Sequence, residues 1–300
     1  MGGLYLACMK ETERLERRLL RATARAIEDF DLVADGDRIL VAVSGGKDSY
    51  VLLHLLSRLR ERAPIRFDLT AVNLDQGHPG FPAETLEAHF RSVGIPFRML
   101  RQDTLSIVKR VVPAGGTFCS ACSRLRRGIL YNAAIEMGCN KIALGHHRDD
   151  LIETLLMSAL YSGRLQTMPV KLRSDDGRNV VIRPMAYAAE EEIAAFAEGM
   201  RFPIVPCGLC GSQPNLMRQR VKGLLTELSA EHPAVKGNLL AALSRVIPSR
   251  LLDRDLQKRL GEATGRDPWL DAEEGDPGPC GDGFAEAPVG LLPLVRGETG

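Results

Sequence analysis

The sequence predicts an α/β protein built on a doubly wound parallel sheet, and two observations carry this prediction. Short apolar runs rich in β-branched residues alternate with helical patterns between residues 38 and 199, which is typical of parallel βαβ units. Polar strings, SGGKDS, LDQG and GHHRDD, follow three of these runs directly. The carboxyl ends of parallel strands lie at one edge of a sheet, where such folds bind ligands. We therefore expect a ligand crevice at that edge.

Each element follows from local patterning. Residues 11–29 place Leu15, Leu19 and Ala26 on one helical face, which predicts an amphipathic helix. The expected strands are 38–43, 66–74, 97–101, 141–145 and 180–184, and the expected helices between and after them are 50–59, 83–93, 120–137, 150–160 and 189–199. Two further helices, 215–229 and 236–246, predict a C-terminal helical extension.

Composition divides the chain into four segments. We expect an N-terminal helical segment over 1–34, a nucleotide-binding α/β domain over 35–202, a C-terminal helical segment over 203–258 and a disordered acidic tail over 259–300. Residues 261–300 carry nine acidic and two basic side chains, a net charge of −7, so the first 260 residues carry +8. A basic body of this kind suits a polyanionic partner, and a solvated surface that is rich in arginine is the alternative that charge alone leaves open.

The chain shows no membrane segment, and its cysteines do not suggest a disulfide framework. No apolar run approaches the roughly 20 residues that span a bilayer. The apolar start MGGLYLACMK is followed at once by the charged ETERLERR, the wrong order for a signal peptide. We therefore expect a cytoplasmic protein that makes no membrane contact. Its seven cysteines, an odd number in a reducing compartment, argue against disulfides.

The string SGGKDS, between a predicted strand and a predicted helix, has the chemistry of a phosphate-binding loop. Glycines allow close backbone approach, the following helix start binds anions, and Lys47 adds a positive charge. Asp48 stands where a Walker A loop has its magnesium-binding Ser or Thr, so this is not a standard γ-phosphate loop. We expect ATP to bind the residues of this string: Ser44, Gly45, Gly46, Lys47, Asp48 and Ser49.

Two adjacent carboxylates, Asp149 and Asp150, begin the helix after the fourth predicted strand. They could hold Mg²⁺, and one of them could instead orient the nucleophile or act as a general base. Acidic residues at a helix start also stabilise the helix, so capping is the alternative. Of His146 and His147, at most one lines the site, because adjacent side chains point in different directions. Asp75 could lie near the ribose or cap a turn.

Four of the cysteines form two C-x-x-C pairs, Cys119/Cys122 and Cys207/Cys210. A helix start and nearby arginines favour thiolates at the first pair, as a cluster or a sulfur-transfer site requires. Zinc is the competing interpretation, although 84 residues separate the pairs and zinc ribbons commonly use about 15–20. Arg126 and Arg127 are candidates to grip phosphate or the backbone of RNA.

These motifs resemble a known family. SGGKDS resembles the loop of the PP-loop ATP pyrophosphatases, which cleave ATP between its α and β phosphates. The strings CSACSRLRRGILY, LGHHRDD, SDDGRNVVIRP and FPIVPCGLCGSQPNL resemble the tRNA 2-thiocytidine synthetases, over about residues 36–250. The resemblance implies an adenine nucleotide alpha hydrolase-like fold. It implies adenylation of the C2 oxygen of cytidine 32 in the tRNA anticodon loop and its replacement by sulfur, with ATP, Mg²⁺ and a [4Fe–4S] cluster.

The resemblance also implies roles for named residues. Three cysteines would hold the cluster and leave one iron open for sulfur: Cys119, Cys122 and one of the second pair, for which we favour Cys210 over Cys207. Lys47, Asp149 and Asp150 would be the catalytic residues. A cysteine desulfurase would supply the sulfur, and we expect a homodimer.

Three alternatives stay open. A 2-thiouridine synthetase would share this fold and differ only in pocket contacts. A lysidine synthetase does not need paired cysteines, which argues against it. A zinc-stabilised RNA-binding protein would have no reason to keep the whole SGGKDS string.

Overall fold

The computed structural model describes residues 2–77, 82–111, 118–205 and 216–264. The chain forms two compact units, Met1–Gln219 and Arg220–Gly300, which divide within helix α8 (Leu216–Glu231). The segment boundaries expected from composition, including the one at 202/203, stay predictions. Within the described residues, no helix is both long and apolar enough to cross a membrane.

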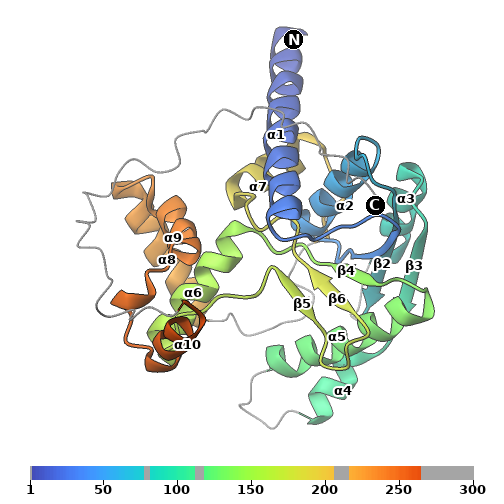
Figure 1. Cartoon of the computed structure of the whole chain (residues 1–300). Coiled ribbons are helices and arrows are strands. Elements are labelled where there is room, and N and C mark those ends of the chain that lie inside the picture. Colours follow the sequence, from blue (N-terminus) through green and yellow to red (C-terminus); the bar gives the residue numbers. More distant parts are fainter. Residues whose placement is uncertain (1, 78–81, 112–117, 206–215, 265–300) are drawn as a thin grey trace, which may run out of the picture. The chain divides into compact units, whose positions relative to one another are not determined.

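The first unit contains a six-stranded sheet with the order β3-β2-β1-β4-β6-β5 (Figure 1). Its strands are β1 (Asp37–Ala42), β2 (Phe67–Asp75), β3 (Phe97–Arg101), β4 (Lys141–Ala143), β5 (Lys171–Arg173) and β6 (Val180–Ile182). All neighbouring pairs are parallel except β5 and β6, which are antiparallel. The strand order reverses between β1 and β4, the point at which doubly wound sheets open a crevice. The predicted fold class is confirmed.

Strand β5 has no counterpart among the predicted elements. Its three residues are all exposed, so the strand carries no alternation of buried and exposed side chains that a sequence pattern could reveal. It forms the antiparallel edge of an otherwise parallel sheet.

The helices agree with the predicted pattern in most places. Those of the first unit are α1 (Gly2–Asp29), α2 (Lys47–Arg60), α3 (Ala83–Val93), α4 (Thr104–Val111), α5 (Phe118–Glu136), α6 (Arg148–Ser162) and α7 (Glu190–Gly199). The second unit holds most of α8, then α9 (Val235–Ser244), a short 3₁₀ helix (Pro248–Arg250) and α10 (Arg254–Thr264). Helices α4 and α10 were not predicted. Helix α10 extends six residues past position 258, where the tail was expected to begin, and 265–300 lie outside the described residues.

Alternating side chains along β1 divide the core between the two faces of the sheet. Ile39 and Val41 join the larger cluster, with side chains from α1, α2, α3 and α7. Leu40 joins the smaller one, with Ala133 and Ala134 of α5. Figure 1 accordingly shows α4 and α5 across the sheet from α2 and α3. The continuous apolar run that predicts a buried strand therefore supplies side chains to both faces of the sheet.

The amino-terminal edge of the sheet carries a buried ion pair. Lys141 Nζ lies 2.6 Å from Asp37 Oδ2, and the two side chains are only 9% and 6% exposed. Asp37 also accepts hydrogen bonds from the Ala34 backbone and the Asn140 amide, and Lys141 donates to the Leu32 carbonyl. Burial alone would raise the pKa of Asp37, but these hydrogen bonds and the lysine charge outweigh it and lower the pKa. Both charges are thus satisfied within the protein.

Candidate active site

The loop between β1 and α2 requires glycine at Gly45. Its φ of +90° is in the left-handed region, and an added Cβ would lie 2.8 Å from Val205 Cγ2. The Val205 backbone N–H donates to the Gly45 carbonyl, so the chain leading toward the second C-x-x-C pair is held against this loop. The Ser49 hydroxyl donates to the Gly46 carbonyl at 2.8 Å, and Ser44 Oγ lies 3.4 Å from Ser49 Oγ. The loop is therefore fixed by contacts within the protein.

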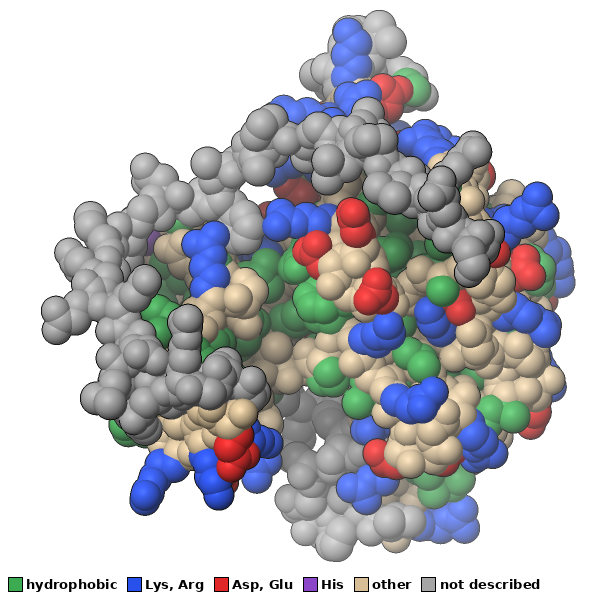
Figure 2. All heavy atoms as spheres, in the orientation of Figure 1, with side chains coloured by type: hydrophobic (Ala, Val, Ile, Leu, Met, Phe, Trp, Pro, Cys, Tyr) green, Lys and Arg blue, Asp and Glu red, His purple; other side chains and the backbone are tan. Residues whose placement is uncertain are grey.

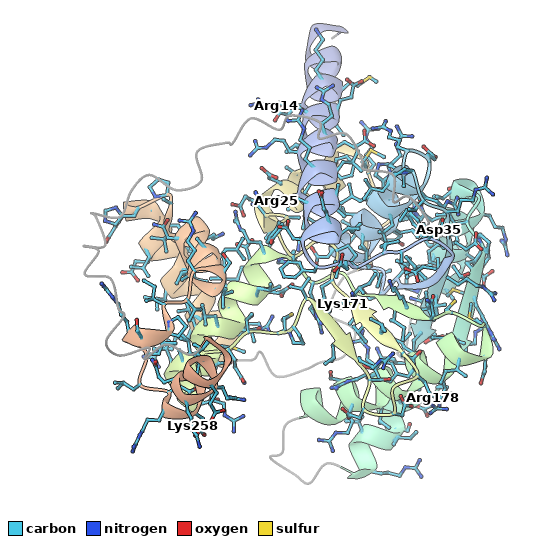
Figure 3. All side chains as sticks on the ribbon, in the orientation of Figure 1. Arg14, Arg25, Asp35, Lys171, Arg178 and Lys258 are labelled. Carbon is cyan, nitrogen blue, oxygen red and sulfur yellow. The ribbon has the colours of Figure 1, made fainter. Side chains whose placement is uncertain are left out.

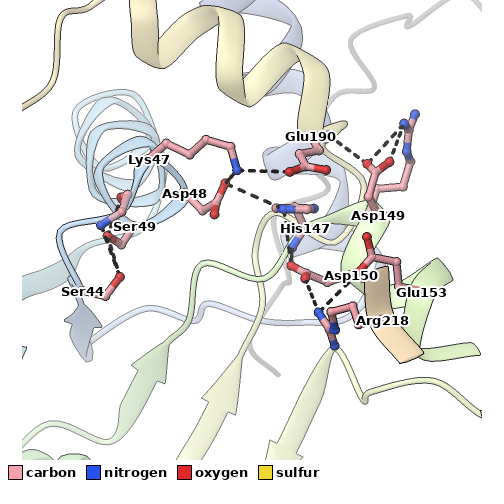
Figure 4. A network of polar contacts seen from close by, with 12 residues as sticks. Ser44, Lys47, Asp48, Ser49, His147, Asp149, Asp150, Glu153, Glu190 and Arg218 are labelled. Carbon is pink, nitrogen blue, oxygen red and sulfur yellow. Dashed lines mark hydrogen bonds and ion pairs between the residues drawn. The ribbon is translucent and has the colours of Figure 1, made fainter. Parts of the chain in front are cut away.

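Lys47, the first residue of α2, is held between two carboxylates (Figure 4). Its Nζ lies 2.9 Å from Asp48 Oδ1 and 3.3 Å from Glu190 Oε1. Partial burial would lower the pKa of Lys47, but these two carboxylates outweigh it and raise the pKa. The side chain therefore stays a cation at the start of a helix, where the backbone also favours anions.

The GHHRDD string lies directly against this loop. A Cβ added at Gly145 would be 3.2 Å from the Asp48 carbonyl, so β4 and α2 meet closely at this point. His147 Nε2 lies 3.8 Å from Asp48 Oδ1 and 3.5 Å from Asp150 Oδ2. The structure thus brings together two strings that are about 100 residues apart in the chain.

The two adjacent aspartates have different surroundings (Figure 4). Asp149 is only 3% exposed; its Oδ2 accepts the Glu190 backbone N–H at 2.9 Å and lies 3.3 Å from Arg148 Nη2. Asp150 is less buried, accepts the His147 backbone N–H at 3.0 Å and lies 3.1 Å from Arg218 Nη1. Asp149 therefore anchors the start of α7, whereas Asp150 stays closer to the surface of the site.

The two histidines point apart, as adjacent side chains should. His147 lies beside Asp48, while His146 Nδ1 accepts a hydrogen bond from Arg183 Nε at 3.2 Å. Burial, and then the positive charge of Arg183, lower the pKa of His146 to about 4. His146 is therefore neutral at physiological pH. Arg183 itself is buried just after β6 and also donates to the Pro169 carbonyl.

The role of the first turn of α7 is not apparent from the sequence pattern. Its glutamates each pair with a cation from a different element: Glu190 with Lys47, Glu191 with Arg148 at 3.0 Å, and Glu192 with Arg18 of α1. The run of three glutamates could have indicated this role. Acidic residues are favourable at the start of a helix, but three in succession form a dense negative charge that attracts cations.

Cys122, the second cysteine of the first C-x-x-C pair, lies at the same edge of the sheet as the glycine loop. The Cys122 thiol, half-buried on α5, donates to Gln76 Oε1 at 3.1 Å, and Gln76 directly follows β2. Asp75 accepts the Gly77 backbone N–H at 2.9 Å, so it caps the turn there. Arg126 and Arg127 of α5 are exposed. The side chain of Cys119, and all of Cys207 and Cys210, lie outside the described residues.

The described residues differ in how well they could bind the expected Mg²⁺ ion and iron–sulfur cluster. Within the described residues, no group of three or more His, Cys, Asp and Glu is arranged to hold a metal ion. The carboxylate of Asp149 is buried and is held by the Glu190 backbone N–H and by Arg148, so it is less accessible to Mg²⁺ than that of Asp150. Asp150 does fit as one carboxylate ligand. The half-buried Cys122 thiol, which contacts Gln76 at the carboxyl end of β2, fits one ligand of an iron–sulfur cluster.

Comparisons with known proteins agree with this geometry. A model of the PP-loop domain family matches residues 12–205. The tRNA-cytidine(32) 2-sulfurtransferase of Anaeromyxobacter sp. (strain K) is 72% identical over 289 residues, 96% of this chain and 99% of that protein. The enzyme of the same name from Sorangium cellulosum (strain So ce56) is 58% identical over 254 residues, 85% of this chain and 90% of that protein.

A solved structure shows the same fold at lower identity. It is the U34-tRNA thiolase NcsA from Methanococcus maripaludis with its [4Fe-4S] cluster. It has a TM-score of 0.60 and 24% identity, and it covers 80% of this chain and 79% of that chain.

The fold and the glycine loop define a PP-loop protein of the ATP pyrophosphatase class. Within that class, the chain belongs to the family of the tRNA-cytidine(32) 2-sulfurtransferases, which are enzymes.

Proposed function

We propose that this chain is an ATP-dependent sulfurtransferase that adenylates the C2 oxygen of cytidine 32 in a tRNA anticodon loop and replaces that oxygen with sulfur. One observation carries the proposal: adjacent strand ends bring together the Cys122–Gln76 pair after β2, the glycine loop after β1 and Asp150 after β4. Nucleotide chemistry and sulfur chemistry would therefore share one edge of the sheet. The names of the relatives point to the same reaction.

The reaction needs an activated oxygen, and the glycine loop would supply the activation. A pyrimidine carbonyl oxygen is a poor leaving group, whereas AMP is a good one. Ser44, Gly45, Gly46 and Ser49 would hold the phosphates of ATP, and Lys47 would stabilise the charge that develops as pyrophosphate leaves. Glu190 would keep Lys47 aimed at the loop while ATP is absent.

The two aspartates would divide the remaining tasks. Asp150 would hold Mg²⁺ together with the phosphates, or orient a proton acceptor, since its carboxylate is less buried. Asp149 would act as a positioning residue, because it holds the Glu190 backbone and hence the start of α7. Asp48 would release Lys47 as phosphate arrives.

The cysteines would hold the cluster that receives the sulfur. Cys119, Cys122 and Cys210 would hold the [4Fe–4S] cluster, with Cys207 as the alternative third ligand. When bound, the cluster would supply an iron site for the incoming sulfur. Gln76 would donate its amide N–H to the Cys122 sulfur once that sulfur is a thiolate. We further propose a cysteine desulfurase as the sulfur source, a homodimer as the assembly and the cytoplasm as the location.

The proposal is tested with Lys47→Ala, purified anaerobically and assayed for 2-thiocytidine in tRNA by nucleoside mass spectrometry. The variant should lose product and ATP binding together while keeping its visible cluster absorbance. Lys258→Ala removes an exposed lysine, 76% accessible, from α10 and is the matched control. If Lys47→Ala forms product near the level of the control, the role of Lys47 in activating the oxygen is refuted. If the wild-type protein forms 2-thiouridine and no 2-thiocytidine, the substrate is uridine and not cytidine.

A further inference from the structure

Helix α1 carries a basic stripe, defined here as Lys10, Arg14, Arg17, Arg18, Arg21 and Arg25, all exposed. At 3.6 residues per turn these six residues lie within an arc of about 100°. At 1.5 Å per residue they extend over roughly 22 Å of the helix. Figure 3 labels Arg14 and Arg25 along this helix, and Figure 2 shows basic side chains at its projecting end.

The stripe is only partly neutralised by neighbouring acids. Arg14 lies 3.8 Å from Glu11, Arg25 lies 3.5 Å from Asp29, and Arg18 pairs with Glu192. Arg17 and Arg21 form no ion pair with any residue that the structure describes. The stripe therefore presents a positive surface to solvent.

Stability of the helix does not explain the stripe. The opposite side of α1 supplies the packing, since Leu15, Leu19 and Ala26 are buried in the core. Like charges one turn apart destabilise a helix slightly. Because Leu15, Leu19 and Ala26 are packed in the protein, these apolar side chains of α1 are not available to insert into a membrane.

The stripe is tied structurally to the candidate active site. The first turn of α7 binds Arg18 of the stripe through Glu192 and Lys47 of the glycine loop through Glu190. A single helical turn thus fixes the stripe relative to the residues proposed to bind ATP. A long polyanion lying along α1 would therefore reach the edge of the sheet where the reaction occurs.

We propose that the basic stripe of α1 binds the phosphate backbone of the tRNA substrate. This inference rests on the proposed function and adds the surface that holds the RNA. Guanidinium groups suit this task, because they contact phosphate oxygens through two parallel hydrogen bonds. Such a surface binds without reading sequence, and its affinity falls as salt rises.

The double variant Arg17→Ala/Arg21→Ala tests the inference in the full-length protein, because it removes the two stripe arginines that have no ion pair among the described residues. The matched control is Arg62→Ala/Arg66→Ala, which removes the same charge from exposed positions at the amino-terminal edge of the sheet. Filter binding of tRNA is measured over a salt series, with ATP affinity measured in parallel. The stripe variant should bind tRNA roughly tenfold more weakly and lose about one to two units of salt slope. ATP affinity should stay unchanged, and the control should match wild type. Arg17→Lys/Arg21→Lys should recover most of the binding.

Three results would overturn the inference. One is tRNA binding by the stripe variant equal to that of the control. The second is an equal loss in both variants, which would indicate net charge rather than a surface. The third is unchanged tRNA binding combined with lost sedimentation on anionic phosphatidylserine vesicles, which would make a membrane the partner. Failure of the proposed function is separate, because the wild-type protein would then form no 2-thiocytidine whatever the stripe variant binds.

Discussion

Paired charged residues lie at both ends of the parallel strands, but they are buried at the amino-terminal edge of the sheet and partly exposed at its carboxyl edge. At the amino-terminal edge, Asp37 and Lys141 are both buried, and their hydrogen bonds end within the protein. At the carboxyl edge, Lys47 and Asp150 are also paired, but their side chains are 28% and 18% exposed. Pairs that are closed off stabilise the fold, while pairs that remain accessible can exchange a protein partner for a ligand. Substitutions at the two edges should therefore separate stability from activity.

The largest effect should come from Cys122→Ala. This substitution removes a proposed cluster ligand at the carboxyl edge, so sulfur transfer should fall to background and the visible absorbance should disappear. ATP binding should persist, because the glycine loop is fixed by its own contacts. Cys139→Ala is the control, since Cys139 is a buried cysteine in the smaller core cluster. Full activity in a colourless Cys122→Ala protein would contradict the role of the cluster.

Next in size is Asp150→Asn. Loss of a metal or proton-handling carboxylate should lower kcat by about 10²–10³-fold, with the free energy of unfolding changed by less than about 1 kcal/mol. The neighbouring Asp149→Asn should change the free energy of unfolding more than kcat. It should lower that free energy by about 2–3 kcal/mol, because Asp149 is a buried partner of Arg148 and of the α7 backbone. Single-turnover kinetics and urea unfolding measure the two quantities. Equal effects from both variants would show that the aspartates do not divide their tasks.

At the amino-terminal edge, Asp37→Asn should cost about 3 kcal/mol of unfolding free energy at pH 7 and leave the kcat of the folded enzyme unchanged. The pKa of Asp37 is lowered below its ordinary value of 3.8, so its contribution is complete above that pH and is lost as the pH falls through the lowered value. The stability difference between wild type and variant should therefore shrink below about pH 4. A difference that is independent of pH would argue against the ion pair as its source.

The smallest effect concerns His146. Because its pKa is lowered from 6.5 to about 4, its contribution to stability is present above pH 6.5 and declines as the pH falls toward 4. In Arg183→Gln, loss of the guanidinium charge should raise the pKa of His146. NMR titration of the imidazole measures both values. A wild-type His146 that titrates near 6.5 would contradict its buried contact with Arg183.

Most strands of the sheet and the glycine loop of the site could be predicted from the sequence, because they depend on local residue patterns. The apolar runs predicted β1 to β4 and β6, and SGGKDS predicted the loop that holds Lys47. What the sequence could not reveal depends on the tertiary fold. Glu190 reaches Lys47 from 143 residues away, and Gln76 reaches Cys122 across 46. The adjacent Asp149 and Asp150 look equivalent in the sequence, and only their neighbours distinguish them.

Nucleoside mass spectrometry of tRNA from a strain lacking the gene shows whether this chain places sulfur on cytidine 32 of tRNA. We expect 2-thiocytidine to disappear from that strain, to return with the wild-type gene and not to return with Lys47→Ala or Cys122→Ala. Unchanged 2-thiocytidine in the deletion strain, or loss of 2-thiouridine in its place, would refute this function.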